Sequence, residues 1–108
     1  MRILPKTLFK DELITAQDVS SDILDVSFCY AGSFQIMWGN GTQTGSVCLQ
    51  ASLDTLNWTE VPNTNCPVGT AAGSLLWNLS DIHYPYVRVN FKLFDPRTVT
   101  ALAFMKGG

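Results

Sequence analysis

The chain has 108 residues, 46% of them hydrophobic and 15% charged, and its formal net charge is −2. This length suits a single domain with its own core. The basic residues are scattered, which leaves no electrostatic case for nucleic acid, and no apolar run approaches the ~20 residues that cross a membrane. The charged fraction is below the usual ~25%, so we expect part of the surface to be covered by a partner or by further copies of the chain.

Residues 1–20 mix apolar and charged side chains without a clean period, and Pro5 argues against a helix there. Two interpretations stay open for this segment. It is either an edge strand of the domain, whose sandwich would occupy residues 21–108, or an arm that reaches a neighbouring subunit. The apolar side chains expected to make its contacts are Leu4, Leu8 and Phe9.

Strict alternation of apolar and polar residues predicts β-strands over residues 22–30, 33–39 and 45–52. The side chains predicted to face the core are Leu24, Val26, Phe28, Phe34, Ile36, Trp38, Val47, Leu49 and Ala51. Asn40-Gly41 predicts a type I′ hairpin turn, because both central residues of that turn need positive φ. A second turn over residues 54–57 precedes a short predicted strand.

The strongest pattern covers residues 74–92, which read as two strands joined by a tight corner at residues 80–83. One side of the second strand is apolar and is expected to be buried with Leu75, Trp77 and Leu79 of the first; it carries Val87, Val89, Phe91 and Leu93. Its other side carries Tyr86, Arg88, Asn90 and Lys92. Residues 62–73 predict a long surface loop, and Asp95-Pro96-Arg97 predicts a turn into a last strand over 98–106.

Seven to eight short strands, separated by Gly, Pro, Asn and Asp turns, indicate an all-β protein. We predict a single antiparallel β-sandwich, of jelly-roll or immunoglobulin-like type, with a small closed barrel as the alternative.

The sequence offers little for catalysis. His83 is the only histidine and lies at a predicted corner, while nucleophilic catalysis needs a base beside the nucleophile. Cys29, Cys48 and Cys66 form no C-x-x-C pair, so we expect free thiols rather than a disulfide or a zinc site. We therefore expect a protein that is not an enzyme and that needs no metal or cofactor.

Several aromatic and basic side chains are candidates for binding. Trp58, Tyr84 and Tyr86 could stack on a glycan, whereas alternation turns Trp38 and Trp77 inward. Two interpretations of Arg88 stay open, a solvated arginine stacked on a cross-strand tyrosine and an anchor of an interface.

Three groups of residues resemble small β-sandwich structural proteins of tailed bacteriophages. In that family a strand x-V-x-L-Q-x-S leads through a D-x-x-N-W turn, as at residues 47–58 here. A Trp-Asn pair then precedes a Tyr-x-Tyr-Val-Arg-Val strand, as at residues 77–89, and a Thr-rich strand ends near Lys-Gly, as at 98–107. The chain departs from the family pattern at Asp95-Pro96-Arg97 and at Cys66-Pro67.

The resemblance implies a virion component that is assembled in the host bacterial cytoplasm. The first hypothesis is a capsid decoration protein that binds the major capsid protein or other virion proteins and forms homo-oligomers, with no contact to nucleic acid or membrane. The alternatives are a glycan-binding module of a tail or fibre, and a head–tail adaptor or tail subunit. The residues proposed for contact with the partner are Leu4, Leu8, Phe9, Val68, Arg88, Asp95 and Arg97.

Overall fold

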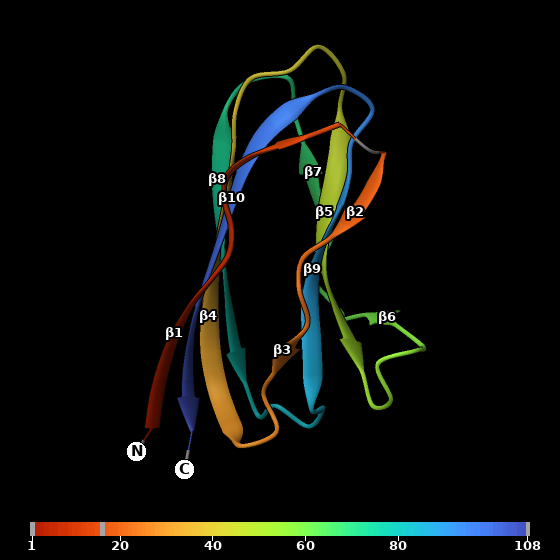
Figure 1. Cartoon of the computed structure of the whole chain (residues 1–108). Coiled ribbons are helices and arrows are strands. Elements are labelled where there is room, and N and C mark those ends of the chain that lie inside the picture. The colour runs from red at the N-terminus through yellow and green to blue at the C-terminus, as the bar shows by residue number, and fades with distance from the viewer. Residues whose placement is uncertain (1, 16, 108) are drawn as a thin grey trace.

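The computed structural model describes residues 2–15 and 17–107, and for residues 2–5 and 11 it describes the backbone alone. These residues form ten β-strands and no helix, so no helix among them could span a membrane. Every strand pairing is antiparallel. Two sheets face each other as a sandwich and do not close into a barrel (Figure 1). The predicted all-β sandwich is confirmed.

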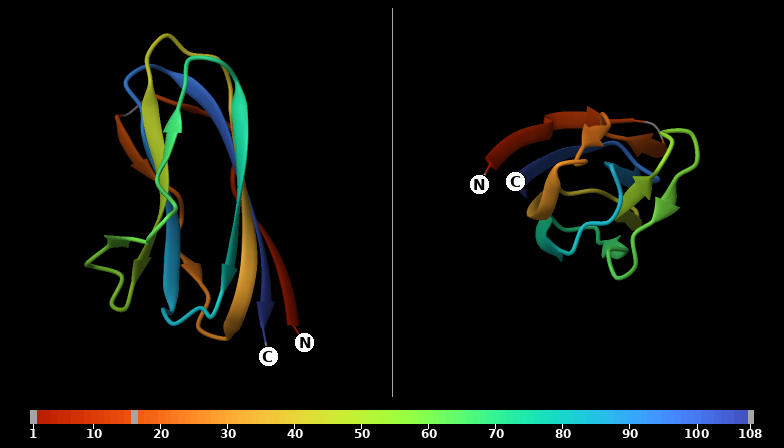
Figure 2. Two further views of the ribbon diagram at one scale, coloured as in Figure 1. Left: turned by 180° about the vertical axis from the view of Figure 1, so that it is seen from behind. Right: turned by 90° about the horizontal axis from the view of Figure 1, so that it is seen from below.

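Sheet A has four strands in the order β1 (Arg2–Ile14), β10 (Arg97–Gly107), β4 (Cys29–Trp38) and β8 (Gly73–Ser80). Sheet B has the order β2 (Asp18–Ser20), β9 (Tyr86–Lys92), β5 (Gly45–Ser52) and β6 (Thr59–Glu60). Two further short strands of sheet B are β3 (Leu24–Asp25), which pairs with β9, and β7 (Cys66–Val68), which pairs with β5. Figure 2 shows the two layers from behind and from below.

The core lies between the sheets and is built by the alternation of the strands. The predicted inward residues Val87, Val89 and Phe91 of β9 are buried, and so is Trp77 of β8, on the other side of the core. The ring of Phe91 also meets Phe9 edge to face, with centroids 5.9 Å apart. The corner after β8 therefore carries the chain from sheet A to sheet B, so that both strands bury their apolar sides in one core.

The N-terminal segment is an edge strand in the structure. β1 pairs with β10 from Arg2 opposite Gly107 to Ile14 opposite Arg97, with register shifts along the way that explain why the sequence has no clean period. Leu8 and Phe9, proposed as contacts with a partner, belong to the domain's own core. The side chain of Leu4 lies outside the described residues.

Two local predictions were wrong. Phe28 was expected in the core, but it lies in a turn between β3 and β4 and is 75% exposed. Asn40-Gly41 does not form a hairpin, because β4 and β5 belong to different sheets and residues 39–44 cross between them. No described glycine has positive φ. Instead the Asn40 side-chain oxygen accepts a hydrogen bond from the Ala72 amide at 2.8 Å.

The predicted loop over residues 62–73 contains the strand β7. Val68, another proposed contact, is fully buried there. Thr64 is buried as well, and its hydroxyl accepts a hydrogen bond from the Leu49 amide at 3.1 Å. This segment thus completes the wall of sheet B beside β5.

Candidate functional site

The proposed contact at residues 95–97 is instead a buried clasp between loops. The Arg97 guanidinium is fully buried and donates hydrogen bonds to the main-chain oxygens of Gly39, Gln43 and Gly69. Its Nε lies 3.5 Å from Oδ1 of Asp95. One cation therefore ties two loops, residues 39–44 and the loop at Gly69, to the turn at residues 95–97, and Arg97 is not available to a partner.

Asp95 completes this clasp. Its Oδ2 accepts a hydrogen bond from the Thr42 amide at 2.6 Å, and this bond, more than the Arg97 charge, lowers the pKa of the carboxyl group. A side chain at Gly41 would collide with both the guanidinium and the carboxylate. Glycine is needed here because the clasp passes close to its Cα, rather than for a turn.

The outer face of sheet B carries Arg88 and Trp58. The guanidinium carbon of Arg88 lies 4.2 Å from the centroid of the Trp58 ring, and its Nε donates to Oε1 of Gln50 at 2.7 Å. Of the two interpretations of Arg88, stacking on a cross-strand tyrosine is wrong, because the ring beneath it belongs to Trp58. The interpretation as an anchor of an interface stays a prediction. The indole N–H of Trp58 donates to the main-chain oxygen of Thr55 at 3.2 Å.

The polar groups of the same face are mostly paired with one another. Asn90 is buried, and its amide nitrogen donates to Asp18 at 2.7 Å and to Ser20 at 3.0 Å.

Cys48 is a buried free thiol. Burial, followed by the negative charge of Glu60, raises its pKa to about 11. Such a thiol is a poor nucleophile at neutral pH.

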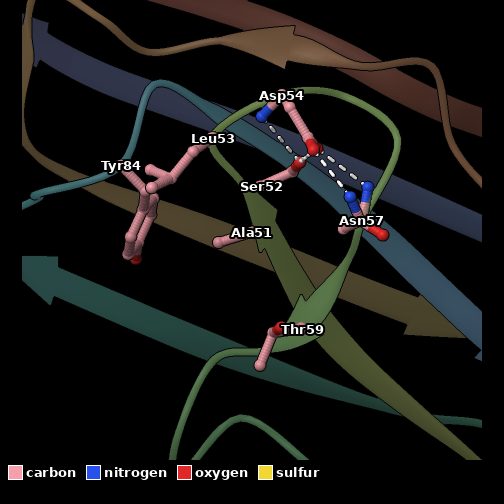
Figure 3. Close-up of a pocket in the computed structure, with 7 residues that line it drawn as sticks. All are labelled: Ala51, Ser52, Leu53, Asp54, Asn57, Thr59 and Tyr84. Atoms are coloured by element: carbon pink, nitrogen blue, oxygen red, sulfur yellow. Dashed lines mark hydrogen bonds between the residues drawn. The ribbon is translucent and has the colours of Figure 1, made fainter.

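A shallow pocket of about 340 Å³ lies beside the loop after β5 (Figure 3). The ring of Tyr84, which comes from the corner before β9, lies next to the Leu53 side chain on one side of it. The rest of its lining consists of Ala51 and of four polar residues, namely Ser52, Asp54, Asn57 and Thr59. Tyr84 is half-buried, and this burial raises the pKa of its hydroxyl.

The carboxylate in this pocket is already occupied by its own loop. Oδ1 of Asp54 accepts hydrogen bonds from the amides of Leu56 and Asn57 at 2.9 and 2.8 Å, and Oδ2 accepts from the Asn57 side chain at 2.7 Å. These bonds hold the pKa of Asp54 far below its usual range. They also hold Thr55 at a φ of 66°, which is costly for a β-branched residue. Asp54 therefore shapes the loop and offers little to a ligand or a proton transfer.

The outer face of sheet A has a different character. Strands β4, β8 and β10 contain no aspartate or glutamate, and Lys106 is their one exposed charged residue. Large apolar side chains are exposed on this face, with Leu76 60% and Phe104 43% accessible to solvent. Leu102 is partly exposed; it lies two residues before Phe104 on β10 and pairs with Gln35 of β4. A hollow of about 420 Å³ lies over these strands and β1. It is lined by the apolar side chains of Leu76, Leu102, Ala103 and Phe104 and by the polar ones of Lys6, Thr7, Ser33 and Gln35.

The described residues present no group of three or more His, Cys, Asp or Glu side chains that could hold a metal ion. His83, the one histidine, is exposed at the corner between β8 and β9. Cys29, Cys48 and Cys66 form no disulfide with one another.

Comparison with known proteins gives a similar fold. No protein-family model matches the sequence, and no curated protein matches it. A solved structure of a carbohydrate-binding module, described as "CBM4 structure and function", is similar with a TM-score of 0.51 and 12% sequence identity. The alignment covers 96% of this chain and 68% of that chain. At this identity the similarity shows the β-sandwich fold alone.

Proposed function

We propose that the chain is a non-enzymatic structural protein that docks on a larger assembly through the outer face of sheet A, as a capsid decoration protein of a tailed bacteriophage would. The observation that carries this proposal is the outer face of β4, β8 and β10, which exposes Leu76, Leu102 and Phe104 around the uncharged polar side chains of Ser33 and Gln35 and has no acidic residue.

Burial of such a face is energetically favourable. Each Å² of apolar surface removed from water contributes roughly 25 cal/mol, and covering strands without carboxylates removes no negative charge from water. Lys106, the exposed charge on these strands, lies near the end of β10. The cores of protein interfaces are depleted of charged residues and enriched in aromatic ones. Sheet B is less suited to this role, because its outer face holds Asp18, Glu60, Arg88 and Lys92. In sheet A most exposed charges lie on the edge strand β1, whereas β4, β8 and β10 expose Lys106 alone.

The contact residues of this proposal differ from those expected from the sequence. Leu8, Phe9, Val68 and Arg97 support the fold from within. The Asp95 carboxylate is held by the clasp. Leu76 and Phe104 take their place as the side chains that would meet the shell.

The proposal is tested by co-sedimentation of the purified protein with phage heads. We expect the wild type to sediment with the heads in amounts comparable to the shell protein, and Phe104→Lys to reduce uptake at least tenfold. Thr44→Lys is the matched control, because it adds the same charge at an exposed residue of the crossover between the sheets. Equal uptake of Phe104→Lys and wild type, or no uptake of either, contradicts the proposal. A few copies per particle would instead support a head–tail adaptor or tail subunit.

A glycan-binding module is the second candidate, and the pocket beside Tyr84 is the observation that favours it. An aromatic ring next to hydroxyl and amide groups suits a sugar, since the ring stacks on the pyranose face and the polar groups bind its hydroxyls. The similar carbohydrate-binding module supports this candidate through its fold only.

Trp58 and Tyr86, the other aromatic residues proposed for glycan contact, are partly exposed. One face of Trp58 is covered by Arg88. If a glycan binds, host polysaccharide should change tryptophan fluorescence, and Tyr84→Ala should abolish that change while Phe104→Lys leaves it intact. Absence of a response to a broad panel of polysaccharides counts against this candidate.

A further inference from the structure

We propose that the chain self-associates through the free edge of β8, which pairs antiparallel with the β8 of a second copy. This inference goes beyond the proposed docking function, because it concerns the contact between copies. The two surfaces share Leu76 at the edge of sheet A, whereas Phe104 belongs to the docking face alone.

The opposite edge of sheet A is protected against such pairing. Strand β1 contains Pro5, which has no N–H to donate, and it exposes the charged side chains of Lys6 and Lys10. Two register shifts also interrupt it. Prolines, lysines and bulges are the means by which edge strands avoid pairing with another chain.

The edge strands of sheet B are protected against pairing with another chain because they are very short. The strands β2, β3, β6 and β7 have three, two, two and three residues. Pro67 has no N–H, so β7 also lacks one hydrogen-bond donor. Very short edge strands offer too few hydrogen bonds for another chain to pair with them.

The edge strand β8 has none of these features. Its eight residues, Gly73–Ser80, contain no proline and no charge, and they pair with β4 without a register shift. No strand in the described part of the chain pairs with its other side. Along a free edge every second residue directs its N–H and C=O away from the sheet. β8 therefore offers an unhindered edge roughly 27 Å long.

A second copy is the partner that this edge fits. In an antiparallel pair with its two-fold axis at Leu76, that residue faces Leu76 of the partner subunit, Leu75 faces Trp77 of the partner subunit, and Ser74 faces Asn78 of the partner subunit. No like charges meet, because β8 has no charge at all. The exposed Leu76 side chains cover each other, which supplies an apolar gain at the centre of the interface. A charged partner strand would find no counter-charge here.

A groove borders the C-terminal half of this edge. A groove of about 420 Å³ runs between residues 76–80 of β8 and residues 61–64, which follow β6 in sheet B. In Figure 2 (left) β8, in green, runs from the top towards the bottom at the right of the view. A single strand edge buries less than the ~800 Å² per partner of a stable interface. The dimer is therefore weak and depends on concentration. Pairing joins the two copies of sheet A into one continuous sheet with a doubled outer face.

Disulfide trapping tests the geometry directly. Directly opposed residues of an antiparallel pair have Cα atoms about 4.5–5.5 Å apart, within reach of a disulfide. On oxidation, Leu76→Cys should form a covalent dimer linked through position 76, as mapped by mass spectrometry, at least ten times faster than Phe104→Cys. Phe104 is the matched control because it lies on the same face, but on β10, which is separated from the edge by β4.

Sedimentation velocity supplies the second test. The wild type should shift from monomer to dimer as concentration rises, and Leu76→Lys should raise the dissociation constant at least tenfold by opposing two like charges. Phe104→Lys should leave it unchanged. A wild type that stays monomeric at the highest concentration, or faster cross-linking of Phe104→Cys, overturns the proposal. Neither measurement uses phage heads, so a failure of dimerisation is distinct from a failure of docking.

Discussion

The Nε atom of Arg97 lies 3.5 Å from Oδ1 of Asp95, and both side chains lie inside the end of the sandwich, at 0% and 8% exposure. The remaining donors of the guanidinium are aimed at main-chain oxygens of the loops that connect sheet A to sheet B. The sequence predicted a surface turn at residues 95–97. In the structure this turn stabilises the fold, so removal of the Arg97 side chain should lower the free energy of unfolding.

Arg97→Met should lower the free energy of unfolding by about 3 kcal/mol or more, because it leaves three carbonyl oxygens without their donor and the Asp95 carboxylate without its counter-charge. Urea unfolding followed by tryptophan fluorescence measures this change. Arg88→Met is the control, since it removes an arginine that is partly exposed on sheet B. An equal effect of the two substitutions would contradict the structural role of Arg97.

The stability of the protein should fall in acid through Asp54 and Asp95, whose pKa values are lowered by hydrogen bonds in the folded chain. A carboxylate with a lowered folded pKa stabilises the fold above its ordinary pKa of about 3.9, and the contribution is lost as pH falls through the folded value. Asp54→Asn should flatten the decline of unfolding free energy below about pH 4. Asp22→Asn, at an exposed residue outside the loop, is the control and should keep the full decline.

The contact between Arg88 and Trp58 should be measurable as a pairwise coupling. A double-mutant cycle with Arg88→Ala and Trp58→Leu should give a coupling free energy of about 0.5–1 kcal/mol, the range for a partly exposed cation over an indole ring. Urea unfolding of the four proteins provides the values. Strict additivity of the two substitutions would mean that the stacking contributes nothing.

Thiol labelling should follow the order of exposure. Cys66 is partly exposed, whereas Cys48 is buried and has a pKa of about 11. At about pH 8 only about one Cys48 side chain in a thousand is a thiolate, the form that reacts. Iodoacetamide followed by peptide mass spectrometry should therefore modify Cys66 first, and Cys48 only after unfolding in urea. Faster reaction of Cys48 than of Cys66 in the folded protein would contradict the burial of Cys48 on β5.

The sandwich and much of its core were predictable because the period of a half-buried strand is local. Val87, Phe91, Trp77 and Ile36 were expected inside from alternation alone, and all are buried. Alternation fails where a strand breaks. The prediction that Phe28 is buried assumed one continuous strand over residues 22–30. Residues 27 and 28 form a turn instead, and the Phe28 side chain is exposed.

Pairings between distant segments could not be read in the same way. The dipeptide Asn40-Gly41 favours a hairpin locally, but its glycine is needed for the close approach of Arg97, which lies at the start of the last strand. The burial of Arg97 likewise depends on three carbonyl oxygens from two loops. Such information becomes visible only when the chain is folded.

The candidate docking surface on sheet A was predictable only in part. The absence of aspartate and glutamate from residues 29–38, 73–80 and 97–107 is written in the sequence. It gains meaning only once those segments are known to be neighbours in one sheet, because then Leu76 and Phe104 share a face. The contact of Arg88 with Trp58 was missed for the same reason, since it depends on where the loop before β6 returns to the sheet.

The pairing of β1 with β10 has a mechanical consequence. Arg2 lies opposite Gly107, so the two strands begin and end side by side at one pole of the molecule (Figures 1 and 2). A tensile force applied between these residues acts across the ladder rather than along it and breaks its hydrogen bonds one at a time. The sandwich should therefore unzip at low force when pulled from this pole, but resist when it is pulled between Arg2 and the loop at residues 39–44 at the opposite pole, where many bonds are sheared together.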